Sequence, residues 1–344
     1  MKILVITQTV DIENTTLGFF HSWLKEISKD FDSVHVICLS EGKHDLGKNV
    51  FVHTLGKDQG ISKISYVLKF YYFIWKYRFE YDKVFVHMNQ EYILLGGIFW
   101  KILKKDIFFW RNHPYGNIWT RIAIFFSKKV FCTSSRSFTA KYENAVLMPV
   151  GIDTNLFKPV SGVQRNKSSI CMVGRISPIK KIDLGLSLMK YLINSGMQVS
   201  LTIVGIVLPR DQEYYLSLVS FVKKNKLGSF IKFVKAVPQN LLPEIYSSHQ
   251  IILNLTEDGS FDKTIVEAVA CGAIPLVANV SLSSFLPDVC ITQSDVESIA
   301  ESIRPLFQYD TKVKIEKDLA VFADKNSLDN LMKKLTQEIS LFLI

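Results

Sequence analysis

Two short segments of the sequence combine residue types that bind anions. In the first, Lys263-Thr-Ile-Val-Glu267 opens a helical pattern directly after a polar turn. The first N–H groups of a helix have no partner within it and carry partial positive charge, so the backbone of Lys263, Thr264 and Ile265 suits a phosphate. Glu267, one turn further on, is suited to accept hydrogen bonds from a ribose. The segment predicts a nucleotide site in outline, and a polar turn that only caps its helix is the alternative.

The second segment is Gly174-Arg-Ile-Ser-Pro-Ile-Lys-Lys181, which follows an apolar run typical of a strand. It places the guanidinium of Arg175 and the ammonium of Lys180 just past the expected end of that strand. A leaving diphosphate gains negative charge as the bond to it breaks, and a bidentate Arg with a Lys stabilises that charge. The segment therefore predicts an electrophilic pair. A salt-bridged surface loop is the alternative.

Apolar runs that alternate with helical patterns supply the elements that position these segments. In the first half, four apolar runs predict buried parallel strands, and helix-length segments separate them. The strands are expected at Lys2–Thr7, His35–Leu39, Lys83–His87 and Val130–Cys132, and the helices include Phe19–Phe31 and Ile61–Tyr77. The first half is therefore predicted to be a doubly wound domain.

A second alternating series follows a segment rich in Pro, Gly, Ser and Asn, which is typical of a connector. Its strands are expected at Ser169–Val173, Gln198–Val204, Ile231–Val234, Ile251–Leu255 and Ile274–Ala278, with helices that include Asp183–Ser195, Glu213–Asn225 and Ser327–Phe342. We predict an α/β fold of two Rossmann-like, doubly wound parallel-sheet domains that face each other across a ligand-binding cleft. The expected divisions are an N-terminal domain (1–155), a linker (156–167), a C-terminal domain (168–326) and a helix that returns to the first domain (327–344).

Length and composition agree with two globular domains. The 344 residues exceed the usual single core of about 250 residues, and the charged share of 21% argues against disorder. Five scattered cysteines without metal-ligand spacing predict buried free thiols in a reducing compartment. The first residues predict a strand and not a signal peptide, and no apolar run reaches the ~20 residues of a membrane-spanning helix.

Basic residues cluster with aromatic ones in two stretches of the first half, residues 69–78 and 99–105, in a chain with a net charge of +9. A basic aromatic surface favours an anionic lipid or an anionic substrate. Ordinary amphipathic helices with solvated lysines are the alternative. Nucleic acid is the weaker option, because no recognisable nucleic-acid-binding module accompanies the charge.

Several motifs in order give the sequence a family resemblance. Gly174-Arg175…Lys180, the helix Glu267-Ala-Val-Ala-Cys-Gly272 and the segment Pro149-Val-Gly-Ile-Asp-Thr-Asn-Leu-Phe157 together resemble glycosyltransferase family 4. These are retaining, nucleotide-sugar-dependent enzymes of GT-B fold, also described as glycosyl transferases group 1. The segments Phe233–Pro238 and Leu242–Tyr246 are similar to the family's base-recognition strand and the helix after it. The resemblance covers nearly the whole chain.

The resemblance implies roles for residues of the second half. It assigns the donor diphosphate to Arg175 and Lys180, which follow Gly174, and the donor ribose to Glu267. It assigns the nucleobase to the backbone around Ala236 and Val237.

Two residues of the first half match the family as well. The resemblance implies that Gly18 lets the backbone approach the phosphates and the acceptor, and a plain turn is the alternative. It implies that the imidazole of His113 hydrogen-bonds beside the reacting sugar, and a structural histidine is the alternative.

The sequence departs from the family at one carboxylate. The family commonly has two glutamates spaced Glu-x7-Glu, but the residue eight before Glu267 is Gly259. Asp262 could take the role of the missing glutamate near the donor sugar, or Lys263 could place a cation over the sugar or phosphate. Lys181, where the family often has glycine, is a milder change. The identity of the donor sugar is therefore left open.

The resemblance implies sugar transfer with retention of anomeric configuration, through an oxocarbenium-like transition state in which the leaving phosphate takes the proton of the acceptor. The sequence offers no nucleophilic triad, no pair of facing carboxylates and no metal-ligand cluster. We therefore expect metal-independent activity without a bound cofactor, the nucleotide-diphosphate sugar being a substrate. The preferred acceptor is a lipid-linked or cell-surface glycan at the cytoplasmic face of a membrane, and a soluble sugar is the alternative.

Three other classes of function remain as alternatives. The chain could be an inactive nucleotide-sugar-binding partner subunit, in which case it would bind nucleotide without hydrolysing the donor. It could be an epimerase or a phosphorylase, although the sequence shows neither added acid/base carboxylates nor a pyridoxal lysine. It could also be a membrane-peripheral scaffold that binds vesicles but no nucleotide.

Overall fold

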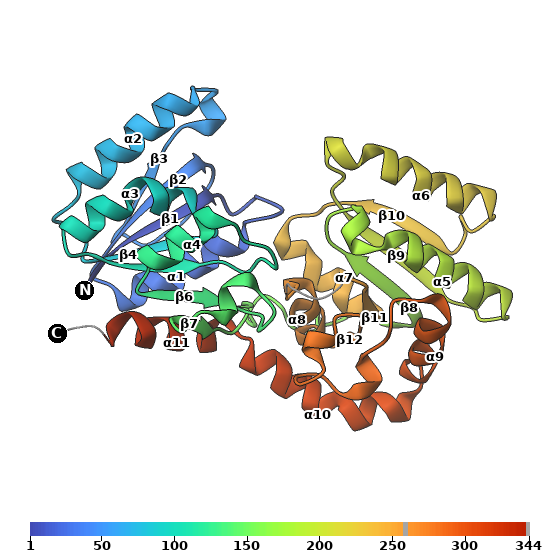
Figure 1. Ribbon diagram of the computed structural model, residues 1–344. Coiled ribbons are helices and arrows are strands. Elements are labelled where there is room, and N and C mark those ends of the chain that lie inside the picture. Colours follow the sequence, from blue (N-terminus) through green and yellow to red (C-terminus); the bar gives the residue numbers. More distant parts are fainter. Residues whose placement is uncertain (257–260, 342–344) are drawn as a thin grey trace. The chain divides into compact units, whose positions relative to one another are not determined.

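The computed structural model of the protein describes residues 1–256 and 261–341. Strands alternate with helices along the chain, and the strands form two parallel sheets (Figure 1). The chain divides into two compact units. The first contains residues 1–151 and, from the far end of the chain, residues 328–341, and the second contains residues 152–256 and 262–327. The boundary between the units falls at Gly151 and Ile152, and the first strand of the second unit begins at Asn166.

Seven parallel strands form the sheet of the first unit. In spatial order they are β3 (Val50–Thr54), β2 (Ser33–Glu41), β1 (Lys2–Val10), β4 (Lys83–His87), β5 (Asp106–Trp110), β6 (Lys129–Cys132) and β7 (Ala145–Leu147). The central strands are nearly continuous apolar runs, because helices cover both faces of the sheet. The chain builds outward from β1 to β3 and then returns to place β4 on the other side of β1.

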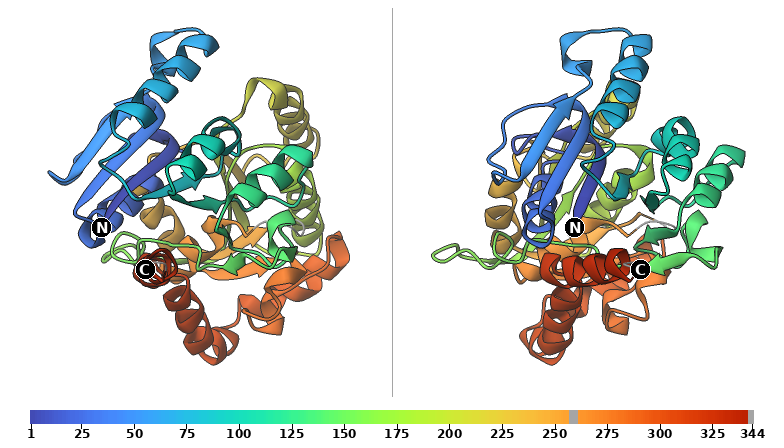
Figure 2. Two further views of the ribbon diagram at one scale, coloured as in Figure 1. Left: turned by 60° about the vertical axis from the view of Figure 1, so that its left-hand side comes forward. Right: turned by 90° about the vertical axis from the view of Figure 1, so that its left-hand side faces the viewer.

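The two faces of this sheet are covered by different helices. Helices α2 (Lys63–Lys76), α3 (Glu91–Ile102) and α4 (Ile118–Phe126) pack on one face, where Phe70, Trp100 and Ile124 join one apolar core. Helices α1 (Phe19–Asp30) and α11 (Leu328–Ser340) pack on the other face. Figure 2 lets the reader follow α11, drawn in dark red, back to the strands of this unit. The end of the chain thus completes a core that its beginning started.

Five parallel strands form the sheet of the second unit. In spatial order they are β10 (Ile231–Lys235), β9 (Ser200–Gly205), β8 (Asn166–Val173), β11 (His249–Asn254) and β12 (Ile274–Val277). The helices of this unit are α5 (Ile182–Asn194), α6 (Gln212–Lys224), α7 (Leu242–Ser248), α8 (Lys263–Ala270), α9 (Val296–Leu306) and α10 (Tyr309–Lys325). The strand order reverses between β8 and β11, which is where doubly wound sheets bind ligands.

The predicted fold class is confirmed, because both sheets are parallel and doubly wound. Each predicted strand overlaps a strand of the structure, but β3, β5 and β7 were missed by the sequence analysis. All five cysteines are buried and free. Among the described residues, a search for helices with the length and hydropathy needed to cross a membrane found none.

Candidate functional site

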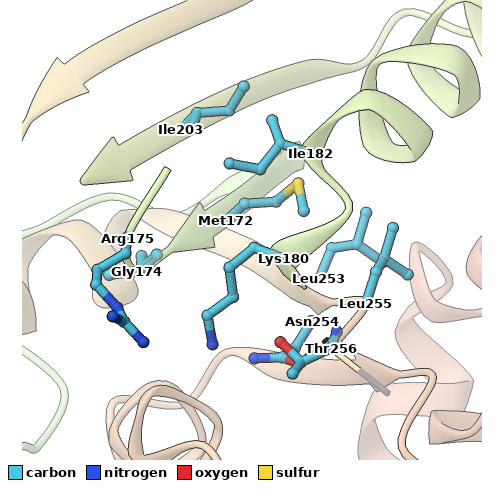
Figure 3. A pocket seen from close by; sticks show the side chains of 11 residues that line it. Met172, Gly174, Arg175, Lys180, Ile182, Ile203, Leu253, Asn254, Leu255 and Thr256 are labelled. Carbon is cyan, nitrogen blue, oxygen red and sulfur yellow. Dashed lines mark hydrogen bonds between the residues drawn. The ribbon is translucent and has the colours of Figure 1, made fainter. Parts of the chain in front are cut away.

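A pocket opens at the carboxyl ends of β8 and β11, where the strand order of the second sheet reverses. Its walls include Gly174 and Arg175 after β8, Lys180 before α5, and Asn254 and Thr256 at the end of β11. Figure 3 shows the side chains of Arg175 and Lys180 extending to the same side of the strand ends, with Asn254 and Thr256 beside the lysine. The two predicted cations are therefore brought together.

The backbone at the end of β8 requires two glycines. Gly174 has φ +146°, which side chains rarely allow, and its N–H donates to the carbonyl of Val204 at 3.0 Å. A Cβ on Gly205, at the end of the neighbouring strand, would lie 1.8 Å from the carbonyl oxygen of Gly174. The close approach of these two strand ends fixes the turn that presents Arg175, whose side chain is exposed.

Lys180 ends a short 3₁₀ turn, Pro178–Lys180, that leads into α5. Lys181 follows in the left-handed conformation, with φ 48°, at the N-cap position of the helix. Glycine adopts this conformation without strain, which accounts for the family's common choice there. Lys181 therefore shapes the entry into α5.

Asp262 holds the amine of Lys180. The carboxylate oxygen Oδ2 of Asp262 lies 2.5 Å from Lys180 Nζ, and it also accepts hydrogen bonds at 2.9 Å from both Asn254 Nδ2 and Thr256 Oγ1. Burial alone would raise the pKa of Asp262, but Lys180 and the two neutral donors outweigh it and hold the pKa below its ordinary value. Asp262 is therefore an ionised anchor that fixes the position of Lys180.

Helix α8 carries the predicted ribose-binding carboxylate on its inner side. Glu267 is 5% exposed, and its Oε2 accepts a hydrogen bond from the hydroxyl of the fully buried Tyr246 at 3.0 Å. Burial raises the pKa of Glu267 to about 7, while the Tyr246 hydrogen bond and the charge of Lys263 act in the opposite direction. A carboxyl group that titrates near neutral pH is typical of functional sites.

The first turn of α8 contains Lys263 and Thr264. Burial lowers the pKa of Lys263 well below its usual range, and the charge of Glu267 partly opposes this shift. The hydroxyl of Thr264 is buried without a hydrogen-bond partner among the described residues, as is the hydroxyl of Ser177 beside Arg175. A ligand oxygen that reached these hydroxyls would give them the partners that buried polar groups need.

The remaining predicted residues lie elsewhere. Ala236 and Val237 follow the edge strand β10 and do not line the pocket. Gly18 is the N-cap of α1 in the first unit and has ordinary helical φ, but a Cβ there would lie 2.6 Å from the carbonyl oxygen of Asn14. Its lack of a side chain is therefore needed by the turn itself. Gly259, with the neighbouring Glu257 and Asp258, lies outside the described residues.

His113 is exposed in the loop after β5 of the first unit. Its Nδ1 lies 2.9 Å from the carbonyl oxygen and 3.0 Å from the backbone nitrogen of Tyr115. This local contact orients the ring and leaves Nε2 as the nitrogen that a substrate can reach.

The sequence analysis missed four residues that hold the predicted site residues in place. Asn254 and Thr256 bind Asp262, Tyr246 binds Glu267, and Gly205 makes room for Gly174. Polar residues at the end of the apolar run Ile251–Leu255 were the available signal for the first two. Among the described residues, no group of three or more His, Cys, Asp or Glu side chains is arranged to hold a metal ion.

Comparisons with known proteins found a family model that matches part of the chain and solved structures that resemble all of it. Residues 153–314 match the family model of the glycosyl transferases group 1. No match was found among curated protein sequences. The match therefore covers the second unit, which contains the Arg175 and Lys180 pocket.

Solved structures resemble the whole chain. HepE of Anabaena in complex with UDP-glucose is 19% identical with a TM-score of 0.77, covering 99% of this chain and 100% of that one. A glycosyltransferase from Rickettsia africae is 15% identical with a TM-score of 0.76, covering 99% of both chains. Sucrose-phosphate synthase of Thermosynechococcus elongatus is 14% identical with a TM-score of 0.73, covering 98% of both. The chain therefore has the GT-B fold, residues 153–314 of its second unit match the glycosyl transferases group 1, and the protein is a glycosyltransferase.

Proposed function

We propose that this glycosyltransferase moves a sugar from a nucleotide-diphosphate sugar, bound by the second unit, to a hydroxyl group of its acceptor, with retention of anomeric configuration. The observation that carries the proposal is the pair of cations, Arg175 and Lys180, at the reversal point of the second sheet. Bond cleavage in the donor leaves negative charge on the diphosphate. A guanidinium and an ammonium placed beforehand stabilise that charge in the transition state.

The diphosphate is proposed to bind between the cations and the first turn of α8. The backbone N–H groups of Lys263, Thr264 and Ile265 lie at the start of that helix, where the helix dipole favours an anion. In the present structure Lys180 binds Asp262. A bound phosphate would share this amine with Asp262, whose contacts with Asn254 and Thr256 keep it in place.

The donor nucleoside is proposed to bind near Glu267. Tyr246 orients the carboxylate of Glu267 by donating to Oε2, so the group can accept hydrogen bonds from ribose hydroxyls. The backbone at Ala236 and Val237 is proposed to contact the base. Because complexes of HepE contain UDP, UDP-glucose, or UDP and glucose, uridine is the first base to test.

The reaction is proposed to need neither a divalent metal nor a bound cofactor, because Arg175 and Lys180 supply the positive charge that a metal supplies elsewhere. We propose that the leaving phosphate accepts the proton of the acceptor hydroxyl. His113, through Nε2, is proposed to hydrogen-bond the sugar. Asp262, as the anchor of Lys180, acts on the leaving group through that lysine.

The acceptor is proposed to be a lipid-linked or cell-surface glycan at the cytoplasmic face of a membrane. An outer apolar face of the first unit supports this choice, and it consists of the exposed side chains Ile64, Leu68, Tyr72 and Trp75 of α2 with Ile98 and Ile102 of α3. Each is more than half exposed. The two helices adjoin, since the rings of Trp75 and Phe99 lie 5.8 Å apart. Exposed apolar patches of this kind mark interaction sites, including membrane contacts.

Some of the lysines in the basic stretch 99–105 border the outer apolar face, but Lys105 does not. Lys101 and Lys104 are exposed at the end of α3. Lys105 instead is 14% exposed, donates to the carbonyl of Tyr81 and lies 3.8 Å from Asp82. Lys105 therefore stabilises the fold and is unsuited to an encounter with anionic lipid. Buried free cysteines are typical of a reducing compartment, which supports the cytoplasmic side.

Calorimetric titration without metal tests the donor site. UDP, GDP and ADP and their sugar conjugates are titrated into the wild-type protein, and the preferred one into Glu267→Ala and Arg175→Ala. We expect one base to bind, with weaker binding in both variants, and slow hydrolysis of its sugar conjugate by the wild type. Binding without hydrolysis would favour the inactive partner subunit, and no binding of any nucleotide would overturn the proposed function.

A further inference from the structure

A second pocket, of about 380 Å³, lies wholly within the first unit, beneath α2. Helix α2 contributes Val67 and Phe70, α3 contributes Leu95, and Leu39 and Leu55 come from the carboxyl-end side of the sheet. This volume is in the range of pockets that bind small ligands, and its walls are mostly apolar. None of the residues assigned to the sugar-nucleotide donor takes part in it.

One wall residue has an unmet hydrogen-bonding group. Tyr92, on the first turn of α3, is 6% exposed, and its hydroxyl is buried without a hydrogen-bond partner among the described residues. The ring is held in place by packing against Phe70, with ring centroids 5.4 Å apart. A buried hydroxyl without a partner destabilises a protein, so it marks a place where a ligand oxygen would be bound.

Two of the three charged residues that line this pocket are basic. Lys57 and Lys63 both line it and are both exposed, against the single carboxylate of Glu91. Lys69 adds positive charge nearby, since its Nζ would lie 3.2 Å from a Cβ placed on Gly56. Apolar walls with lysines at the solvent side match a molecule that has an apolar chain and an anionic group.

We propose that this pocket binds the apolar chain of an acidic, phosphate-bearing lipid acceptor, with the phosphate held by Lys57 and Lys63 and an ester oxygen at the Tyr92 hydroxyl. The inference rests on the proposed function and names the acceptor class that this enzyme uses. The other surface of α2 supports it, because Ile64 and Leu68 lie on the outer apolar face while Val67 and Phe70 line the pocket. One helix thus contacts both the membrane and a chain drawn from it.

A soluble sugar fits this pocket poorly. Sugar hydroxyls need a hydrogen-bond partner for each donor and acceptor that they bury. Apart from Lys57, Lys63 and Glu91, which are exposed at the solvent side, the polar residues of the described lining are Tyr66, Asn89 and Tyr92. Asn89 is already engaged, since its Oδ1 accepts from Gln8 Nε2 at 2.9 Å. The apolar walls of the pocket would cover sugar hydroxyls without offering them hydrogen bonds.

Calorimetric titration with dodecyl phosphate, kept below its critical micelle concentration, tests the inference. We expect wild-type protein to bind it, and to bind inorganic phosphate or dodecanol more weakly, because each lacks one half of the match. Tyr92→Phe removes only the hydroxyl and is expected to fold normally while binding dodecyl phosphate roughly threefold to tenfold more weakly. Val67→Trp fills the pocket and is expected to abolish binding.

The matched control is Val321→Trp, which makes the same substitution at an exposed position of α10 in the second unit. It is expected to bind dodecyl phosphate as the wild type does. Wild-type protein that fails to bind dodecyl phosphate, or a folded Tyr92→Phe variant that binds it unchanged, would overturn the inference. Titration of the same samples with UDP keeps the two proposals apart, since a protein that binds UDP but not dodecyl phosphate retains its donor site and loses only the lipid pocket.

Discussion

Both sheets of this protein reverse their strand order in the same way, but the side chains at the two reversal points differ in kind. At the reversal between β8 and β11 the charged residues Arg175 and Lys180 line a pocket, and Asp262 binds Lys180. Between β1 and β4 the ring of Phe20 stacks on His87, with centroids 4.2 Å apart. The topology therefore allows a ligand pocket at the reversal point of each sheet, and the side chains there determine whether that space is a pocket or is filled.

In the first unit, the pocket beneath α2 does not lie at the point where the strand order reverses. The side chain of Trp23 packs against His87 and Trp110, so this edge of the sheet is filled by its own aromatic residues. The pocket beneath α2 lies on the opposite face, where the apolar core contains Phe70 and Tyr92. The second unit is therefore suited to a charged ligand, and the first to an apolar one.

Phe20→Ala tests the structural side of this comparison and has the largest expected effect. Phe20 is fully buried, so its loss leaves a cavity and is expected to lower the free energy of unfolding by about 3–5 kcal/mol. Thermal or denaturant unfolding measures this. Nucleotide affinity, measured where the variant is still folded, is expected to stay near the wild-type value. A stability close to wild type would mean that aromatic packing does not close the first reversal point.

Arg175→Ala and Lys180→Ala test the chemical side. Each is expected to reduce turnover about 10²–10³-fold, corresponding to about 2.7–4 kcal/mol of transition-state stabilisation. The exposed Arg175 can be removed with little change in unfolding temperature, whereas Lys180→Ala also leaves the carboxylate of Asp262 without its cation.

Lys190→Ala, which removes an exposed lysine of α5 outside the pocket, is the control and is expected to be fully active. Steady-state rates at saturating donor separate these cases. Near-normal turnover in both pocket variants would show that Arg175 and Lys180 do not take part in catalysis.

Gly205→Ala tests whether the close approach of β8 and β9 holds the charged pocket open. The added Cβ would lie 1.8 Å from the carbonyl oxygen of Gly174, so the backbone must shift. We expect a loss of about 1–3 kcal/mol in stability together with weaker nucleotide binding. Gly228→Ala, whose Cβ would meet nothing within 4 Å, is the control. If the two variants behaved alike, steric contact at Gly205 would not position Arg175.

The sequence predicted the architecture and the charged residues because both have local signals. The runs of β1 and β8 are apolar throughout, and the cations Arg175 and Lys180 follow a strand end directly. Edge strand β3 was missed because its residues are half exposed, and β7 because three residues form no pattern.

Partnerships over long sequence distances had no such signal. The bond between Lys180 and Asp262 joins residues 82 positions apart, and the clash that Gly205 avoids involves Gly174 on another strand. The aromatic closure of β1 and β4 joins Phe20 to His87. Only the folded sheet shows these contacts, and they decide which reversal point is open.

Charge reversal at the end of α3 tests the membrane side of the first unit. Lys101→Glu and Lys104→Glu are each expected to weaken binding to phosphatidylserine-containing vesicles by more than the roughly 1 kcal/mol that one lysine contributes near an anionic surface. Lys48→Glu, an exposed position outside α2 and α3, is expected to have a smaller effect. Vesicle sedimentation at fixed ionic strength measures this, and equal sedimentation of all three variants would argue against a membrane-binding face.

The pH dependence of nucleotide binding gives the finest test of the second unit. Burial raises the pKa of Glu267 to about 7, above its unfolded value near 4.5; Asp262 raises this pKa further, while Tyr246 and Lys263 lower it. The native state therefore binds this proton more tightly than the unfolded state. The resulting contribution to stability is complete below about pH 4.5 and is lost as pH rises through about 7.

Binding of the donor is expected to follow the opposite direction. The ionised carboxylate accepts hydrogen bonds from ribose hydroxyls, so the affinity for UDP-glucose should rise as pH increases through about 7, by less than tenfold per pH unit for a single proton. The titration uses UDP-glucose and not UDP, because the diphosphate of UDP-glucose does not ionise near neutral pH. Glu267→Gln keeps the shape but cannot ionise, and its affinity should be nearly independent of pH over this range. A wild-type profile as flat as that of Glu267→Gln would show that the buried carboxylate does not contact the ribose, and the charged pocket would then have to recognise its donor through the phosphates and the base alone.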